Sequence, residues 1–223
     1  MNIFFNIITY TLLCSIPDNK CLPASRLIQS VKPHDNDRPR IIPQHRLLHR
    51  SRYDYEEYAC QEAFGRDPEK VLCFHELRRR AVLDCHPHDG HRLIAAMPEA
   101  RVITQNIDGM QQRAGSRKED FGRSYETLRC DCGEWLRPAI VWFGDLLDEA
   151  VMREASATVG DCDLFVSIGT SGTVWLVASY PALARKTGAC CIEINPEPSG
   201  AIGYDLVIRE PASKALPELF ATK

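Results

Sequence analysis

With 223 residues, of which 44% are hydrophobic and 26% are charged, the chain is long enough to bury a substantial core in one α/β domain, with room for a small insertion. The net charge is only −3, which argues against direct binding to nucleic acid through a basic face. The ten cysteines are mostly isolated within apolar stretches, unlike the dense framework of a small secreted protein. We therefore expect an intracellular protein whose thiols are mostly small buried side chains, with disulfides as the alternative.

The first 17 residues are apolar and aromatic, and two interpretations suit them. They are similar to the apolar region of a signal peptide, but no Lys or Arg precedes them and no clear cleavage site follows. They are also too short to span a bilayer comfortably, so no membrane partner is expected. The preferred prediction is a buried β-strand that ends in a turn at residues 15–18.

The rest of the chain alternates between helical and strand patterns. Residues 18–51 lack periodicity and predict a loop, whereas Asp67, Pro68 and Glu69 are the start signal of a helix that runs to about Leu83. A shorter helix is expected over residues 92–97. Apolar, β-branched runs predict buried strands at residues 101–108, 139–143, 163–168 and 190–194. The predicted fold class is therefore α/β, a Rossmann-like parallel sheet with helices on both faces.

Polar residues stand at the carboxyl ends of three predicted strands, where open α/β sheets bind ligands. The turn at residues 169–172 has glycines that permit a phosphate to approach the backbone, but glycine turns between a strand and a helix are more often plain turns. Asn195 and Glu197 suit ribose hydroxyls, or form a solvated turn. The strand predicted at residues 101–108 ends in a cluster of two amides and a carboxylate: Gln105, Asn106 and Asp108. Such a cluster is costly in a core without partners, so a binding role is as well supported as a structural one.

Four blocks, taken in order, resemble the signature blocks of the sirtuin family: residues 102–115, 136–144, 168–172 and 192–197. The resemblance runs from about Tyr53 to Leu219 and is greatest with the bacterial and mitochondrial-type branch. It implies a Rossmann-type domain, a small zinc domain and a cleft between them. It also implies a division into a divergent N-terminal segment, residues 1–50, and an NAD-binding catalytic domain, residues 51–223.

The resemblance implies an NAD-dependent protein deacylase, a transferase that removes acyl groups from the lysines of proteins or peptides. Nicotinamide would be released, and the acyl group would end on ADP-ribose. Asn106 and Asp108 would take part in catalysis. The implied contacts to NAD are Gln105, Asn106, Asp108, Gly169, Thr170, Ser171, Asn195 and Glu197.

The resemblance also implies how the acylated substrate would be held. A substrate peptide would pair as an added strand with Val141, Trp142, Phe143 and Gly144. Arg78, in the stretch His75-Glu-Leu-Arg78, would receive acidic acyl groups. A surface helix with three basic residues, Arg78 to Arg80, explains that stretch equally well.

Three features of the family are missing from the sequence. Residues 7–9, Ile-Ile-Thr, stand where a glycine-rich phosphate loop is expected, and their side chains would obstruct the pyrophosphate. Phe121 or Gly122 stands where the family has a catalytic His, and neither accepts a proton. Zinc needs two cysteine pairs, and only Cys130 and Cys132 remain, so we expect no bound zinc and a zinc domain that is reduced or lost. The alternatives are a protein that binds NAD or acylated peptide without turnover, and a mono-ADP-ribosyl transferase.

Overall fold

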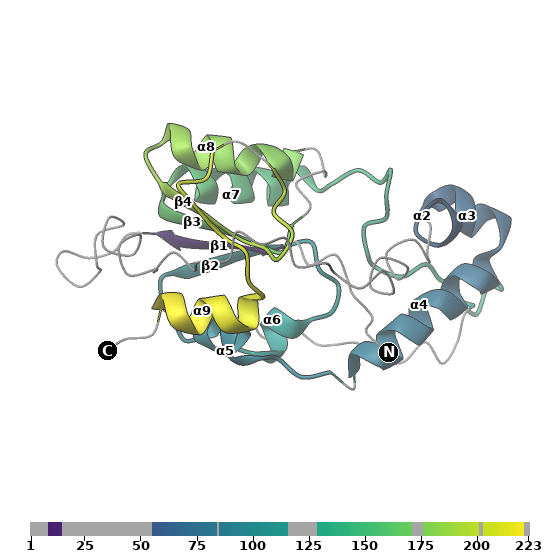
Figure 1. The fold of residues 1–223 in the computed structure, drawn as a ribbon. Coiled ribbons are helices and arrows are strands. Elements are labelled where there is room, and N and C mark those ends of the chain that lie inside the picture. Colours follow the sequence, from purple (N-terminus) through teal and green to yellow (C-terminus); the bar gives the residue numbers. More distant parts are fainter. Residues whose placement is uncertain are drawn as a thin grey trace. The chain divides into compact units, whose positions relative to one another are not determined.

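The computed structural model describes residues 9–14, 55–83, 85–115, 129–170, 176–200 and 203–220. These residues fall into two compact units (Figure 1). Unit 1 holds the described residues up to Cys85, other than the first strand, and residues 129–148. Unit 2 holds that first strand, residues 86–115 and everything described from Glu149 onward. The predicted domain boundary at residue 50 and the predicted loop at residues 18–51 lie outside the described residues.

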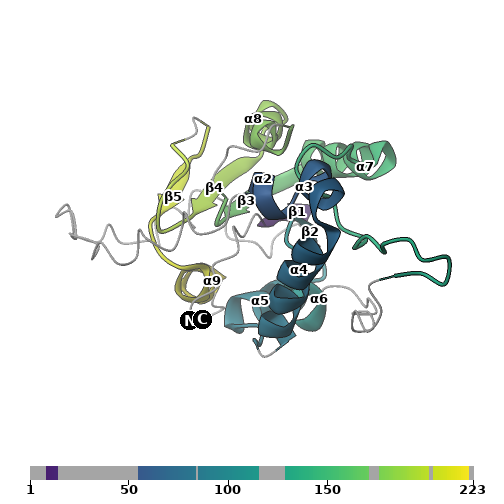
Figure 2. The ribbon, with the colours of Figure 1, turned by 90° about the vertical axis from the view of Figure 1, so that its right-hand side faces the viewer.

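Unit 2 is built around a five-stranded sheet in the order β2-β1-β3-β4-β5 (Figure 2). The neighbours β3-β4 and β4-β5 pair in parallel, whereas β1 pairs antiparallel with both β2 and β3. Strands β2 and β3 therefore point the same way on either side of a reversed β1. The strands are β1 (Thr9–Cys14), β2 (Ala100–Thr104), β3 (Cys162–Ile168), β4 (Cys190–Ile194) and β5 (Leu206–Ile208).

The Rossmann-like prediction is confirmed, with one difference in strand direction. The predicted N-terminal strand exists as β1, and its turn at residues 15–18 lies outside the described residues. An apolar strand satisfies its neighbours' backbone groups in either direction, so the sequence pattern of β1 carries no signal for its reversal. The result is a sheet that is parallel apart from one interior strand, β1.

Helices cover both faces of this sheet, as predicted. In Figure 1, α7 (Glu149–Gly160) and α8 (Tyr180–Lys186) lie on one face, while α5 (Asp89–Ala95) and α9 (Ala212–Phe220) lie on the other. The short helix α6 (Met110–Arg113) follows β2, and a 3-10 helix, η2 (Leu176–Ser179), precedes α8. The helix expected at residues 92–97 begins earlier, because His88 caps α5 by accepting a hydrogen bond from the backbone of Gly90.

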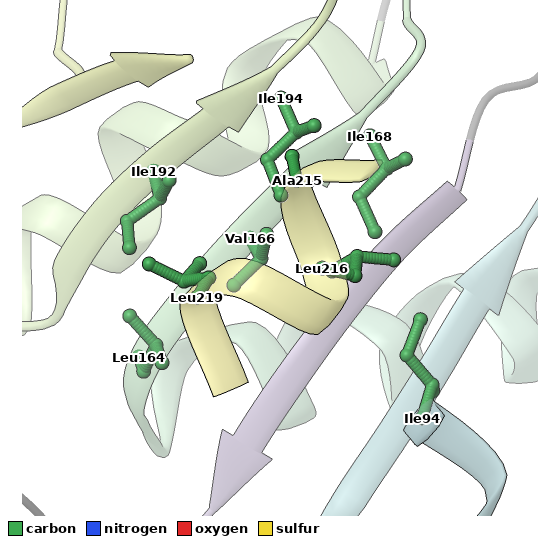
Figure 3. Packing of buried hydrophobic residues seen from close by; sticks show 9 residues of the cluster. All are labelled: Ile94, Leu164, Val166, Ile168, Ile192, Ile194, Ala215, Leu216 and Leu219. Carbon is green, nitrogen blue, oxygen red and sulfur yellow. The ribbon is translucent and has the colours of Figure 1, made fainter. Parts of the chain in front are cut away.

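The strands supply two hydrophobic clusters because their side chains alternate between the faces. Phe165 of β3 and Cys191 of β4 pack with Tyr180 on the side of α7 and α8. The opposite cluster, on the side of α5 and α9, is shown in Figure 3. It consists of Ile94, Leu164, Val166, Ile168, Ile192, Ile194, Ala215, Leu216 and Leu219. Burial of each large side chain contributes about 1.5–3 kcal/mol to the stability of the fold, so these clusters hold the sheet and its helices together.

The contact between α5 and α9 predicts a sensitive position at Gly90. A Cβ atom there would lie 2.8 Å from Leu216 Cδ1 and 3.1 Å from the carbonyl oxygen of Ala212. We expect Gly90→Ala to lower the free energy of unfolding by about 1–3 kcal/mol through overpacking, measured by urea denaturation. Gly160→Ala is the matched control, since nothing lies within 4 Å of its added Cβ. Equal stability of the two variants would contradict the packing of α5 on α9.

The described residues of unit 1 form three helices and the segment 129–148. The helices are α2 (Tyr55–Tyr58), α3 (Gln61–Arg66) and α4 (Pro68–Leu83). The predicted start of the long helix is confirmed, because Asp67 Oδ1 accepts a hydrogen bond from the Lys70 backbone 3.0 Å away. Within the described residues, no helix has both the length and the apolar character that a membrane crossing requires.

The prediction of a strand at residues 139–143 is wrong, because the structure has no strand there. Phe143 forms only an isolated parallel bridge with Cys60, and its backbone donates to the carbonyl oxygen of Ala59 at 3.1 Å. Trp142 is buried, yet its partners are side chains of α3 and α4 rather than a sheet. Val141 and Phe143 are more than half exposed, at 57% and 54%. The apolar run that resembled a strand instead docks on the helices of unit 1 through Trp142 and the partly buried Ile140.

Candidate functional site

The carboxyl ends of the parallel strands in unit 2 meet at one edge of the sheet. Thr104 of β2 and Ile168 of β3 both lie opposite Thr9, the first residue of β1. Ile168 lies opposite Ile194 of β4, which lies opposite Ile208 of β5. The polar residues predicted to follow β2, β3 and β4 are therefore brought to the same edge. Open α/β sheets bind ligands outside such an edge, where the strand order reverses.

Thr9 occupies this edge between the ends of β2 and β3. This is the position at which a glycine-rich phosphate loop was expected and where the sequence has residues 7–9. The first two of those residues lie outside the described part of the chain. Because β1 is reversed, its amino end rather than its carboxyl end faces this side of the sheet.

The residues after β2 form a compact polar turn. Thr104 Oγ1 accepts a hydrogen bond from the backbone of Asn106 at 3.1 Å, which sets the direction of the chain as it leaves the strand. Gln105 is exposed and Asn106 is half-buried. Asp108 is buried, and its Oδ1 accepts from the Met110 backbone at 3.0 Å.

Burial raises the pKa of the Asp108 carboxyl above its ordinary value, against the hydrogen bond from Met110 and the charge of Arg113. Such a carboxyl takes up a proton more readily than an exposed one. The side chain of Gln111 is also buried, and its Oε1 has no hydrogen-bond partner among the described residues. The turn after β2 thus concentrates buried polar groups that are costly without a ligand or a functional role.

The turn after β3 begins at Gly169, which has a positive φ of 65°. Residues with a Cβ adopt this conformation at a cost, so glycine fits here. The Gly169 backbone donates to the carbonyl oxygen of Ile194 at 2.9 Å, extending the contact between β3 and β4 beyond their last residues. Thr170 is only 2% exposed. Ser171, the next predicted contact to NAD, lies outside the described residues.

Asn195 ties the turns after β3 and β4 together. Its Nδ2 donates to the Thr170 carbonyl oxygen at 2.8 Å, and its Oδ1 accepts from the Glu197 backbone at 3.2 Å. Its own backbone donates to the Ile208 carbonyl oxygen of β5 at 2.9 Å. Asn195 is 8% exposed, whereas Glu197 is exposed. The amide of Asn195 therefore organises the edge, and the carboxylate of Glu197 is the more accessible group.

Sequence reasoning missed Ser167 and Glu193, which lie opposite each other on β3 and β4. Both are fully buried, at 0% and 1% exposure, one residue before the strands end. Glu193 Oε1 accepts from the Ser199 backbone at 2.7 Å, which holds the chain that follows β4. A charged residue within the apolar run Cys190–Ile194 was the signal that could have identified this position.

The candidate substrate residues belong to unit 1. Trp142 Nε1 donates to His75 Nε2 at 3.1 Å, and the Arg137 guanidinium lies 4.1 Å from the centre of the Trp142 ring. Burial, helped by the charge of Arg78, lowers the pKa of His75 to about 4, so the ring is neutral and accepts this bond near neutral pH. Gly144 has a φ of 87°, where glycine is favoured. The exposed Val141 and Phe143 alternate with the fixed Trp142.

The three arginines of α4 differ in their surroundings. Arg79 and Arg80 both form ion pairs with Glu76, at 2.7 Å each. The Arg78 guanidinium instead lies over the ring of Phe74, 5.2 Å from its centre. These contacts distinguish Arg78 from its two neighbours, and both interpretations of the stretch stay predictions.

Comparison with known proteins identifies the family. The Sir2 family model matches residues 45–121 and 118–175. The NAD-dependent protein deacylase 1 of Pseudomonas aeruginosa is 36% identical over 204 residues, which cover 76% of this chain and 82% of that protein. This chain is a member of the Sir2 family. The NAD-dependent protein deacylase of Mycobacterium tuberculosis is 38% identical over 200 residues, which cover 76% of this chain and 84% of that one.

Solved Sir2 structures share the fold. A Sir2 homologue in complex with NAD has a TM-score of 0.67 and 31% identity, and the match covers 75% of this chain and 77% of that one. A Sir2 protein bound to a myristoylated histone peptide has a TM-score of 0.61 and 30% identity, with 74% and 83% covered. The predicted membership of the sirtuin family is confirmed.

The described residues of this Sir2 chain do not fit the family's zinc. A structural zinc site takes four ligands, usually thiolates. In the part of the chain that the structure describes, no group of three or more His, Cys, Asp or Glu side chains is arranged to hold a metal ion. Cys130 and Cys132 are joined in a disulfide, so neither offers a thiolate. Phe121 and Gly122, at the place of the family's catalytic His, lie outside the described residues.

Proposed function

We propose that this chain removes acyl groups from protein lysines in an NAD-dependent reaction. The observation that supports this most is the shared edge of β2, β3 and β4, to which the strands bring four positions of the family blocks: Gln105, Asn106, Gly169 and Asn195. The donor set suits NAD, because it combines accessible amides, a glycine turn and the exposed carboxylate of Glu197. When bound, NAD supplies an electrophilic ribose carbon that takes the acyl oxygen as nicotinamide leaves.

The proposed roles follow from burial and charge. Asn106 and Asp108 act at the reacting end, where a buried carboxyl with a raised pKa can hold or accept a proton. Gly169, Thr170 and Ser171 bring backbone groups to the remainder of NAD, and Glu197 accepts hydrogen bonds from ribose hydroxyls. Asn195 acts mainly by holding these turns in place.

Acylated proteins or peptides are the proposed partners, and residues 51–223 the proposed catalytic domain. Val141 and Phe143 present exposed apolar side chains beside the backbone that would pair with a peptide, and Trp142 and Gly144 set its course. Arg78 provides a cation for an acyl group that ends in a carboxylate. We place this activity inside the cell, without nucleic-acid or membrane partners.

The test is a mass-spectrometric assay of the purified full chain with NAD and matched acetyl-lysine and succinyl-lysine peptides. We expect loss of the acyl mass from the peptide together with nicotinamide and acyl-ADP-ribose, and none of these without NAD. Asp108→Asn is expected to lower the rate by about 100-fold, as for loss of a group that moves protons. Asp163→Asn is the control, because Asp163 is exposed and lies at the opposite end of β3 from this edge. A rate for Asp108→Asn equal to that of the control would contradict the assigned role.

A second candidate function is binding of NAD and acylated peptide without turnover. It is favoured by one observation, that Phe121 and Gly122 offer no side chain that accepts a proton where the family has a His. Calorimetric binding of NAD with no product in the assay would support it. Recovery of turnover in Phe121→His or Gly122→His would then show that the missing base alone separates the two functions.

A further inference from the structure

The turn that contains Cys130 and Cys132 is closed by its own backbone. The Cys130 backbone N–H donates to the carbonyl oxygen of Glu134, and the Gly133 N–H donates to that of Cys130, each at 2.9 Å. Gly133 has a φ of 88°, which a residue with a Cβ adopts at a cost. Arg129 and Trp135 pair across the open end as an antiparallel bridge. These bonds hold the two cysteines with their Cα atoms 5.3 Å apart, within the range that a disulfide requires.

Side chains reinforce the same turn. The Arg129 guanidinium lies 3.7 Å from the centre of the Trp135 ring, and its Nη1 donates to the Gly133 carbonyl oxygen at 2.7 Å. A cation stacked on an aromatic face stabilises the pair by about 0.5–1 kcal/mol at an exposed site. None of these contacts needs a metal ion or the second cysteine pair of the family. The turn can therefore persist whether the two sulfurs are bonded to each other or reduced.

We propose that Cys130 and Cys132 are a reversible thiol–disulfide site, which takes the place of half of the family's zinc site. Cys132 is exposed and Cys130 is half-buried, so a small thiol can reach the bond. Exposed disulfides are the ones that exchange readily. The proposal concerns sulfur chemistry alone and does not depend on deacylase activity.

The exchange is balanced with a low-molecular-weight thiol such as glutathione. One glutathione thiolate attacks a sulfur of the disulfide, forming a mixed disulfide and releasing the other cysteine as a thiolate that takes up a proton. A second glutathione thiolate attacks the glutathione sulfur of the mixed disulfide and releases the second cysteine. Two cysteines are reduced and two glutathiones are oxidised to their disulfide. The reverse sequence, started by glutathione disulfide, closes the bond.

The other described cysteines are less suited to this chemistry. Cys190 and Cys191 are neighbours on β4, but burial raises the pKa of both thiols, that of Cys191 to about 11. They therefore form little thiolate near neutral pH. Cys60 and Cys162 are buried. Cys73 and Cys85 are exposed, and neither is in a disulfide. Cys73, on α4, serves as the matched control.

The sequence allows the pair to be measured without interference. Trypsin cleaves after Arg129 and after Arg153 but not between Arg137 and Pro138, so one peptide, residues 130–153, contains both cysteines and no others. Cys73 lies in a separate peptide, residues 71–78. The purified full chain is equilibrated at a series of ratios of glutathione to glutathione disulfide and alkylated with N-ethylmaleimide under denaturing conditions. The alkylated chain is then digested with trypsin, and the peptide masses are measured by mass spectrometry. Zinc is measured on the same sample.

In reducing buffer we expect peptide 130–153 to carry two alkyl groups. As the buffer becomes oxidising, it should change in a single step to a form without alkyl groups that is two hydrogens lighter than the reduced, unalkylated peptide. In Cys132→Ser, Cys130 should instead gain a glutathione adduct, while Cys73→Ser should leave the midpoint of the step unchanged. Full alkylation of both cysteines in oxidising buffer would overturn the proposal. So would one zinc per chain that is lost in Cys132→Ser.

Discussion

Asn195→Asp is expected to lower the free energy of unfolding by about 2–4 kcal/mol, because it places an oxygen where Nδ2 now donates to the Thr170 carbonyl oxygen. Two acceptors would then face each other at a site that is only 8% exposed. The substitution keeps the oxygen that accepts a hydrogen bond from the Glu197 backbone. The loss of stability therefore reports only the hydrogen bond that Nδ2 donates. The loss should shrink at low pH, where the new carboxyl takes up a proton and can donate. Urea denaturation at several pH values measures both effects.

Glu197→Gln is the matched control for Asn195→Asp. The backbone of Glu197, rather than its exposed side chain, bonds to Asn195, so stability should change by less than about 0.5 kcal/mol. Its affinity for NAD should fall about tenfold or more if the carboxylate accepts from ribose hydroxyls. Wild-type stability in Asn195→Asp would contradict the view that this amide holds the turns after β3 and β4 together.

His75→Ala is expected to lower the free energy of unfolding by about 3–5 kcal/mol, as for loss of a buried ring. His75 is 7% exposed, stacks on Trp142 and accepts the hydrogen bond from Trp142 Nε1. His75→Phe keeps a ring and removes the acceptor, so it should cost about 1–3 kcal/mol for the unpaired indole N–H. His86→Phe, at an exposed histidine, is the control. Equal stability of His75→Phe and the control would exclude the hydrogen bond as a source of stability.

The same histidine predicts how stability depends on pH. The pKa of His75 is lowered to about 4 in the folded chain, while an unfolded histidine titrates near 6.5, so the unfolded chain binds the proton more readily. Its contribution is therefore complete above about pH 6.5 and is lost as the pH falls toward 4. Burial also lowers the pKa values of His88 and His91, which add to the slope. His75→Phe should reduce the slope over this range without abolishing it.

Much of the fold was predictable because its signals are local. The apolar runs that became β3 and β4 are buried on both faces, and the Asp67-Pro68 start signal is read within one helical turn. The direction of β1 was not predictable, since an apolar strand pairs equally well either way. The segment at residues 139–143 shows that an apolar run identifies a segment with buried side chains, not the partner that buries them.

The placement of these polar residues in the fold was predictable, and their contacts were less so. Gln105, Gly169 and Asn195 could be placed at one edge because each comes at the carboxyl end of a predicted apolar strand. The engagement of the Asn195 amide with the Thr170 carbonyl could not be foreseen, because the two residues are 25 positions apart. The disulfide between Cys130 and Cys132 was equally unpredictable, since two cysteines that are two positions apart suit a metal site as well as a disulfide.

The central claim, that this Sir2 chain uses NAD to remove acyl groups from protein lysines, is tested most directly by following acyl-ADP-ribose in the peptide assay with the purified full chain. We predict that acyl-ADP-ribose and nicotinamide appear in equal amounts with the deacylated peptide, only when NAD is present, and that the Asp108→Asn chain is about 100-fold slower. Deacylated peptide that forms equally without NAD, or a chain that neither turns over nor binds NAD, would contradict the claim.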